Sequence, residues 1–144
     1  MPEKPFHLAV RAIIRDERDR CLLLRRSSAC KHFVGTWEWP GGKAERGEEV
    51  DEAVRREVRE ETALEIELKG VAGSYGIEMA RLRIAVLCME ARCTGGTLLL
   101  SEEHDESAWV PIAELPKWDL TPGLREFALG HVVGRIEPEK QGGP

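Results

Sequence analysis

Apolar runs of β-strand length, separated by short polar or glycine-containing segments, recur along the chain. The runs at 6–15 and 21–25 are separated by the polar cluster DERDR, which predicts a hairpin-like pair of strands joined by a turn. Further runs end at glycine-marked turns or before a proline, and these predict additional strands over 64–77, 81–93, 97–101 and a segment that ends at Trp109–Val110.

Two segments have helical periodicity instead. Residues 49–62 contain good helix formers without Gly or Pro, and Val50, Val54 and Val58 recur every four positions. A second helix is predicted over 122–131, where a proline comes first and apolar residues follow at helical spacing. Both helices therefore have an apolar face that requires a partner.

The order of these elements predicts an α/β fold. Strands with interspersed helices and hairpin-length connections favour a mixed sheet packed between helices. Residues 27–47, which are interrupted by glycine and proline, are expected to form a long loop. The length of 144 residues fits one domain, expected over 1–137, with a flexible tail over 138–144.

Composition narrows the class of protein. The chain has 42% apolar residues but no run near the ~20 that span a membrane, and it has no secretory signal pattern, so we expect no membrane association and a cytoplasmic location. Four cysteines without a C-x-x-C pair are expected to be ordinary thiols. The net charge of -5 argues against binding of long nucleic acid, although small anions remain candidates where a cation intervenes.

Three glutamates are clustered on the first predicted helix. Glu57, Glu60 and Glu61 fall within about 100° of helical arc, at the edge of the valine face. Carboxylates without nearby His or Cys suit Mg²⁺ or Mn²⁺ rather than zinc. The preceding Gly41-Gly42-Lys43 offers close backbone approach and a cation, so the cluster could grip a metal-complexed polyphosphate; the alternative is a solvated acidic helix face.

The spacing across residues 42–64 resembles the catalytic box of the Nudix hydrolases, G-x5-E-x7-R-E-U-x-E-E-x-G-U, where U is a bulky aliphatic residue. The matching residues are Gly42, Glu48, Arg56, Glu57, Val58, Glu60, Glu61 and Leu64. Ala63 stands where the pattern has glycine, and a left-handed residue there predicts local strain or a shifted helix cap without loss of activity.

This resemblance implies a Nudix-type α/β/α sandwich and a metal-dependent attack of water on a diphosphate linkage. It implies that Glu57, Glu60 and Glu61 bind Mg²⁺, or Mn²⁺, with the Gly41 carbonyl as a further ligand. Arg56 and Glu48 would pair to hold the loop–helix–loop in shape. The general base is expected to be Glu103 in the acidic run SEEHDE, with Glu60 or Glu61 as the fallback and a solvated acidic turn as the alternative.

Outside the box, LLLRR at 22–26 and WEWPGGK at 37–43 resemble the MutT-like branch, which acts on nucleoside triphosphates, including oxidised ones. That branch implies a substrate-binding role for Arg26 at the nucleotide pocket, and for Asp119 and Trp118 at the nucleobase. Lys43, the cation beside the glutamate cluster, is the further substrate-binding candidate. A solvated cation at 26, a loop residue at 119 and a core aromatic at 118 are the competing interpretations. The four histidines have no ligand spacing, and none is assigned a role.

The leading prediction is an enzyme that converts a (d)NTP, oxidised or otherwise noncanonical forms included, to NMP and pyrophosphate, as a monomer or homodimer. Met79 and Ala80 occupy the region where ADP-ribose-cleaving relatives tend to have a proline, and the SQPWPFPxS signature of NADH-cleaving relatives is absent. A hydrolase of another nucleoside diphosphate derivative, such as a nucleotide sugar, is one alternative. The other is a noncatalytic nucleotide-sensing module, since a fold can be reused for binding alone.

Overall fold

The computed structural model describes residues 4–133, in which seven strands form one mixed sheet. The strands are β1 (Phe6–Arg15), β2 (Arg20–Arg26), β3 (Trp37–Glu38), β4 (Gly41–Lys43), β5 (Glu65–Glu78), β6 (Arg83–Gly95) and β7 (His104–Pro111). The helices are α1 (Val50–Thr62), the 3₁₀ helix η1 (Ile112–Lys117), α2 (Leu124–Phe127) and the wider helix η2 (Ala128–Val133). The tail predicted over 138–144 lies outside the described residues.

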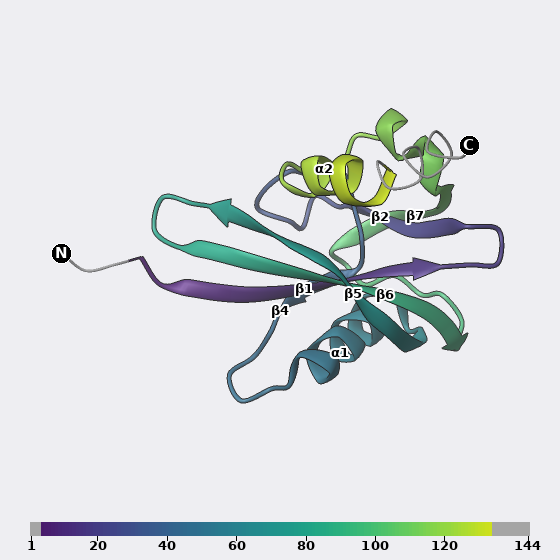
Figure 1. Cartoon of the computed structure of the whole chain (residues 1–144), viewed down its shortest axis with the longest axis horizontal. Helices are drawn as coiled ribbons and strands as arrows, with labels where there is room; N and C mark the ends of the chain where they lie inside the picture. Colours follow the sequence, from purple (N-terminus) through teal and green to yellow (C-terminus); the bar gives the residue numbers. More distant parts are fainter. Residues whose placement is uncertain (1–3, 134–144) are drawn as a thin grey trace, which may run out of the picture.

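The sheet has the order β3-β2-β1-β6-β5, with β4 paired to β1 and β7 to β2. The pairing of β1 with β6 is parallel along all of β1, and the other strand pairs are antiparallel. Helix α1 covers one face, and α2 with its neighbouring helical turns covers the other (Figure 1). The predicted α/β/α sandwich with a mixed sheet is therefore confirmed.

Successive residues of β1 and β2 face opposite sides of the sheet and so supply two separate cores. On the α1 side, Val10 and Leu22 pack with Val54 and Val58 of the helix. On the α2 side, a second buried cluster contains Ile13, Leu23, Cys21, Trp39, Leu124 and Phe127. Each large apolar side chain buried in this way contributes about 1.5–3 kcal/mol relative to exposure. Burial on both faces explains why the two strands read as nearly continuous apolar runs.

The predicted pair of strands at 6–15 and 21–25 exists, but the two pair only next to their turn. Their register is a single pair, Arg15 with Cys21, because β1 continues beside β6 and β2 continues beside β7. The Asp16 carboxylate accepts the backbone N–H groups of Arg18 and Arg20, both at 2.9 Å, and closes the turn. The turn is therefore local, whereas the strands' main partners are distant in sequence.

The prediction of a strand over 97–101 is wrong. This segment is irregular, because its backbone bonds to the end of α1 instead of to a strand: Leu99 N–H donates to the Thr62 carbonyl at 2.9 Å and Ser101 N–H to the Glu61 carbonyl at 3.3 Å. Leu98 and Leu100 pack against the core under α1, whereas Leu99 is 73% exposed. The resulting alternation of burial imitates a strand.

The start of the second helix differs from its prediction, and the end of α1 has a conformation that the missing glycine explains. The helix predicted over 122–131 begins at Leu124, since Gly123 has a φ of 84° that a helix cannot include, and its second half widens into η2. Helix α1 ends at Thr62, and the capping residue Ala63 has a left-handed φ of 61°, the conformation expected of the glycine that it replaces. Within residues 4–133, no helix has the length and apolar character needed to cross a membrane.

Replacing Ala63 by glycine is expected to stabilise the protein. The left-handed conformation costs a residue with a β-carbon about 1–2 kcal/mol, and the greater freedom of glycine in the unfolded chain offsets part of this gain. Ala63→Gly should therefore raise the free energy of unfolding by roughly 0.5 kcal/mol, measured by urea denaturation. The control Glu52→Gly, on the exposed side of the regular part of α1, should lower it by about 1 kcal/mol. Equal losses in both variants would contradict strain at Ala63.

Candidate active site

The three box glutamates of α1 lie together at the edge of its buried face but differ in exposure. The side chain of Glu60 is 58% exposed and that of Glu57 13% exposed, while Glu61 is buried at 4%. This gradient follows from their helical spacing, since each residue is turned by about 100° from the last. The sector predicted from the sequence is thus present, and it runs from solvent into the core.

Arg56 ties these carboxylates to the preceding loop. Its Nε and Nη2 donate to the two oxygens of Glu48 at 2.6 and 3.0 Å, and Nη2 also donates to the Lys43 carbonyl at 3.0 Å. Nη1 donates to Glu57 at 3.1 Å and to Glu60 at 3.2 Å. The bond to Glu48 is the main reason that the pKa of Arg56 is raised, and it lowers the pKa of Glu48. The two residues predicted to brace the loop are therefore in contact.

Two glycines let the loop backbone approach the glutamates closely. A β-carbon on Gly42 would lie 2.6 Å from an oxygen of Glu57, and one on Gly41 would lie 2.0 Å from the Val10 carbonyl oxygen. The Gly41 N–H donates to Glu61 at 2.9 Å. Burial raises the pKa of Glu61 to about 9 against the opposing effects of this bond and of Arg11, and burial also raises the pKa of Glu57. The Gly41 carbonyl stays a prediction as a ligand.

The donor chemistry fits a hard divalent cation. Among the described residues, no three Asp, Glu, His or Cys side chains already converge as a ready ligand set, and the Arg56 guanidinium supplies positive charge between Glu57 and Glu60. Around these two glutamates, however, a hollow of about 380 Å³ is completed by Ser101, Glu102 and Glu103. Oxygen donors alone suit Mg²⁺ or Mn²⁺, and Gly42 lets the loop backbone lie close against Glu57, which lines the hollow.

Glu103 is brought to the same hollow as Glu57 and Glu60 by a turn that precedes β7. The turn is fixed by Ser27, whose N–H donates to the Glu103 carbonyl at 2.8 Å and whose hydroxyl donates to the Glu102 carbonyl. The negative charge of the Glu103 carboxylate is among the lesser causes of the raised pKa of Glu57. The placement is compatible with the predicted general base, and the role itself stays a prediction.

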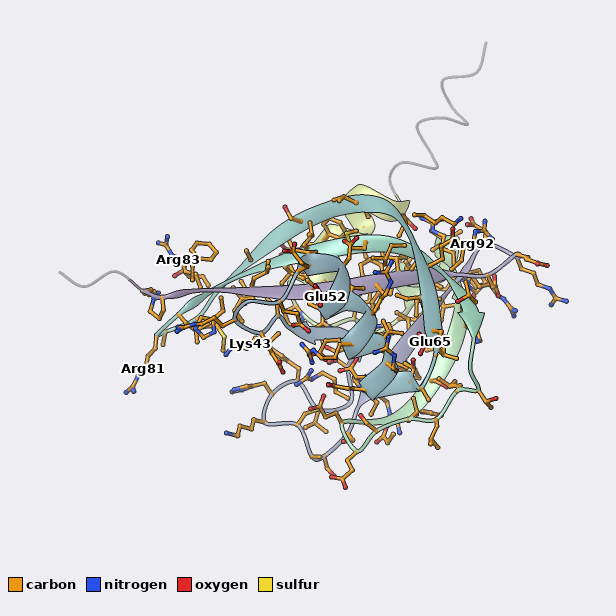
Figure 2. All side chains as sticks on the ribbon, turned by 90° about the horizontal axis from the view of Figure 1, so that it is seen from below. Lys43, Glu52, Glu65, Arg81, Arg83 and Arg92 are labelled. Carbon is orange, nitrogen blue, oxygen red and sulfur yellow. The ribbon has the colours of Figure 1, made fainter. Side chains whose placement is uncertain are left out.

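Lys43 is the one predicted substrate-binding residue that shares a hollow with the box glutamates in the described structure. A second hollow of about 790 Å³ is lined by Lys43, Arg46, Glu57 and Glu60, together with the exposed Phe6. Figure 2, seen from the α1 side, places Lys43 near the helix that presents Glu52 outward, and places Arg81 and Arg83 near one end of the β5–β6 hairpin. A lysine beside carboxylates is suited to a metal-complexed phosphate.

The predicted nucleobase residues gather around β3 instead. Trp118 packs edge-to-face on Trp37 with ring centroids 4.7 Å apart, and the Asp119 carbonyl accepts the Trp37 N–H at 2.8 Å, leaving Asp119 exposed. Arg26 donates from Nη1 to Glu38 at 3.0 Å and from Nε to the His32 carbonyl at 2.9 Å. These residues do not line the two hollows beside the box glutamates, and their substrate-binding roles stay predictions.

The sequence interpretation missed a buried group centred on Glu38. Glu38 contacts Arg11, Arg26 and His104, of which Arg26 alone had been given a role. The available signal was Arg11, a charge in the interior of the apolar run of β1, with apolar residues on both sides. A charge at such a position requires a buried partner, but the sequence does not say which one. His104, without ligand spacing, gave no signal.

The mixed sheet, the loop that contains Gly41 and Gly42, and the helix α1 with its glutamates together define an α/β/α protein. Its candidate site is acidic and lies where the loop meets the helix. A family model described as the NUDIX domain matches residues 5–129, and the chain belongs to the Nudix family. The structure of a MutT protein from Methanosarcina mazei Go1 is similar with a TM-score of 0.82 and 31% identity, covering 98% of this chain and 99% of that one.

Relatives with named activities extend the comparison. The human 8-oxo-dGDP phosphatase NUDT18 is 35% identical over 128 residues, 86% of this chain, which spans 36% of the length of that relative. The CTP pyrophosphohydrolase of Escherichia coli K12 is 33% identical over 113 residues, covering 78% of this chain and 82% of the relative. The class predicted from the sequence box, a Nudix hydrolase, is the class to which these named relatives belong.

Arg56→Lys is expected to lower turnover of a hydrolysed nucleotide by about 10- to 100-fold, because an ammonium cannot reproduce the forked contact with Glu48 and also reach Glu57. The matched control is Arg59→Lys, since Arg59 makes an exposed pair with Glu65 on the same helix. Steady-state kinetics on both variants checks this expectation. Similar rates for the two variants would show that the fork of Arg56 has no function in turnover.

The Glu38 group predicts a specific acid sensitivity. Burial alone would raise the pKa of Glu38, but Arg11, His104 and Arg26 lower it from 4.5 to about 2. Because the folded-state pKa is depressed, the stabilisation is present above the unfolded value and is lost as the pH falls toward the folded value. The difference in unfolding free energy between wild type and Glu38→Gln should narrow by roughly 1 kcal/mol from about pH 6 to about pH 3.5. Urea titrations measure this difference, and a constant gap would refute the lowered pKa.

Proposed function

We propose that this protein is a Mg²⁺-dependent hydrolase that converts a nucleoside triphosphate, oxidised or otherwise noncanonical forms included, to NMP and pyrophosphate. The observation that carries the proposal is the acidic hollow in which Glu57 and Glu60 of α1 face the Glu103 turn. Hydrolysis of nucleotides by relatives named CTP pyrophosphohydrolase and nucleoside triphosphatase supports the substrate class. Mn²⁺ would fit the same oxygen donors.

In this mechanism Glu57, Glu60 and Glu61 would hold a divalent ion, with the Gly41 carbonyl as a further donor. When bound, the ion neutralises phosphate charge and makes water more acidic. Glu103 takes a proton from the attacking water while the water oxygen bonds to phosphorus. The bridging P–O bond breaks at the same time, and its electron pair leaves with pyrophosphate. Lys43 pairs with a phosphate oxygen, while Arg56 and Glu48 keep α1 and the loop in register.

The base end of the substrate is assigned to the residues around β3. Arg26 and the indole of Trp118 offer a donor and an aromatic edge there, and the exposed carboxylate of Asp119 offers an acceptor. The proposal carries two further expectations, a cytoplasmic location and a monomeric or homodimeric state. Long nucleic acid is not an expected partner, in keeping with the net charge of -5.

A second candidate substrate is an oxidised nucleoside diphosphate. The relative named 8-oxo-dGDP phosphatase, 35% identical over 128 residues, favours it. The chemistry at the carboxylates would be the same, since both substrates contain a phosphoanhydride. Product analysis separates them, because the triphosphate gives pyrophosphate and the diphosphate gives inorganic phosphate.

The test is a panel of normal and oxidised nucleoside tri- and diphosphates and a nucleotide sugar, incubated with Mg²⁺, with products separated by chromatography. We expect NMP from one or more triphosphates. Glu60→Gln should lower that turnover by about 100-fold or more while the fold is kept, because the Glu60 side chain is 58% exposed.

Glu52→Gln, which changes an exposed residue on another side of α1, is the control and should keep wild-type turnover. Binding without cleavage of any nucleotide would favour the sensing module over the enzyme. Cleavage of the nucleotide sugar alone would replace the substrate class, and full turnover in Glu60→Gln would remove Glu60 from the metal site.

A further inference from the structure

Glu38 is a buried carboxylate on β3 that contacts residues of three other strands. It is 3% exposed on β3, and its Oε2 lies 2.9 Å from His104 Nε2 of β7 and 3.0 Å from Arg26 Nη1 of β2. Its Oε1 lies 3.4 Å from Arg11 Nη2 of β1. Within the described residues, His104 Nδ1 is buried without a hydrogen-bond partner, so Glu38 anchors this ring.

A contribution to folding stability does not by itself explain why a buried charged group is present here. Burying charged side chains is costly, and well-packed apolar replacements of buried ion pairs are often neutral or stabilising. The pKa of Glu38, which falls to about 2 because Arg11, His104 and Arg26 outweigh burial, indicates that the carboxylate is charged. A charged group held in this way fixes the positions of the chain segments that its partners belong to. The partners of Glu38 therefore show which segments it positions.

On one side the group reaches the glycine loop. Arg11 Nη1 donates to the Trp39 carbonyl at 2.7 Å, and the Ala12 N–H of the same strand donates to the Pro40 carbonyl at 2.8 Å. The next residue along the chain is Gly41, whose N–H donates to Glu61 at 2.9 Å. Arg11 thus holds the chain directly before the contact between loop and metal-site helix.

On the other side the group reaches the turn that carries Glu103. His104 follows Glu103 directly, and the Glu103 carbonyl accepts the Ser27 N–H at 2.8 Å. Ser27 in turn follows Arg26, another partner of Glu38. Both chain segments that bring Glu103 to the hollow are therefore attached to Glu38 one residue away.

We propose that Glu38 is a positioning residue for the reaction: through Arg11 it sets the Gly41–Glu61 contact, and through His104 and Arg26 it sets the Glu103 turn, so that the two sides of the acidic hollow keep a fixed separation. This inference rests on the proposed function, since it assigns Glu38 a part in that reaction. It goes beyond the box residues, because neither Glu38 nor His104 lies in the box.

The first test does not depend on activity. In Glu38→Gln, amide hydrogen exchange should accelerate about tenfold or more at Ser27 and Gly41, while Ala53 of α1, whose N–H donates to the Glu49 carbonyl at 2.9 Å, should keep its wild-type rate. In His104→Leu, Ser27 alone should accelerate, because Arg11 keeps its partner. Equal acceleration at Ser27, Gly41 and Ala53 would mean that Glu38 only stabilises the whole fold and would overturn the proposal.

The second test uses the nucleotide that the wild-type protein cleaves best. Glu38→Gln should lower kcat about 10- to 100-fold with KM changed less than about threefold, as for a lost positioning contact. The neighbouring Asp105→Asn, which breaks only an exposed pair with Arg25, should keep wild-type kcat. The kcat loss of His104→Leu should disappear when Glu103→Gln is already present, because the effect acts through Glu103.

Failure of the proposal and failure of the proposed function are distinguishable. If the wild-type protein cleaves no nucleotide, the proposed function fails, and the exchange pattern alone decides whether Glu38 positions both segments. If cleavage occurs but Glu38→Gln keeps its kcat, the positioning role is overturned. Should Glu38→Gln not fold, His104→Leu, which leaves Glu38 paired with both arginines, decides by Ser27 exchange and by its coupling to Glu103→Gln.

Discussion

Mutual repulsion of carboxylates is the constraint on which the rest of the site depends. Glu57 and Glu60 share one sector of α1 with Glu61, and like charges one turn apart, such as those of Glu57 and Glu60, disfavour a helix. Arg56 counters the repulsion directly, because it contacts Glu57 and Glu60 with one nitrogen and holds Glu48 with two others. Compensation by an arginine anchored in the loop makes loop and helix one unit, so charge balance and geometry have the same origin.

The buried end of the cluster is compensated differently. Glu61 is too enclosed to be solvated, and the Gly41 N–H and the more distant charge of Arg11 only partly offset the effect of burial, which raises its pKa to about 9. Arg11 is itself buried and requires Glu38. A chain of compensation therefore runs from the helix through β1 to β3, and Arg26 and His104 extend it to β2 and β7. The sheet is thus electrostatically coupled to the carboxylates as well as packed beneath them.

Local patterns predicted what local interactions determine. The helix at 49–62, its valine face and the pairing of Arg56 with Glu48 follow from spacing within one segment, and Ala63 takes the left-handed conformation that its position in the box implied. The failed strand at 97–101 and the unnoticed Glu38 group depend on partners far away in the chain. Leu99 bonds to Thr62, and Glu38 meets a histidine 66 positions later. Periodicity and spacing contain no information about such pairs.

The same network fixes Arg26, the residue proposed to meet the base end of the substrate. Arg26 is held at two points, by Glu38 and by the His32 carbonyl, so it loses less conformational entropy on meeting a ligand than a free arginine would. Even with His104 neutral, two guanidinium groups, those of Arg11 and Arg26, face the single carboxylate of Glu38. The group therefore carries a surplus positive charge next to β3. In the proposed function, a surplus of this sign at β3 would complement the negative charge of a nucleotide, while the carboxylate oxygens of α1 would hold the divalent ion.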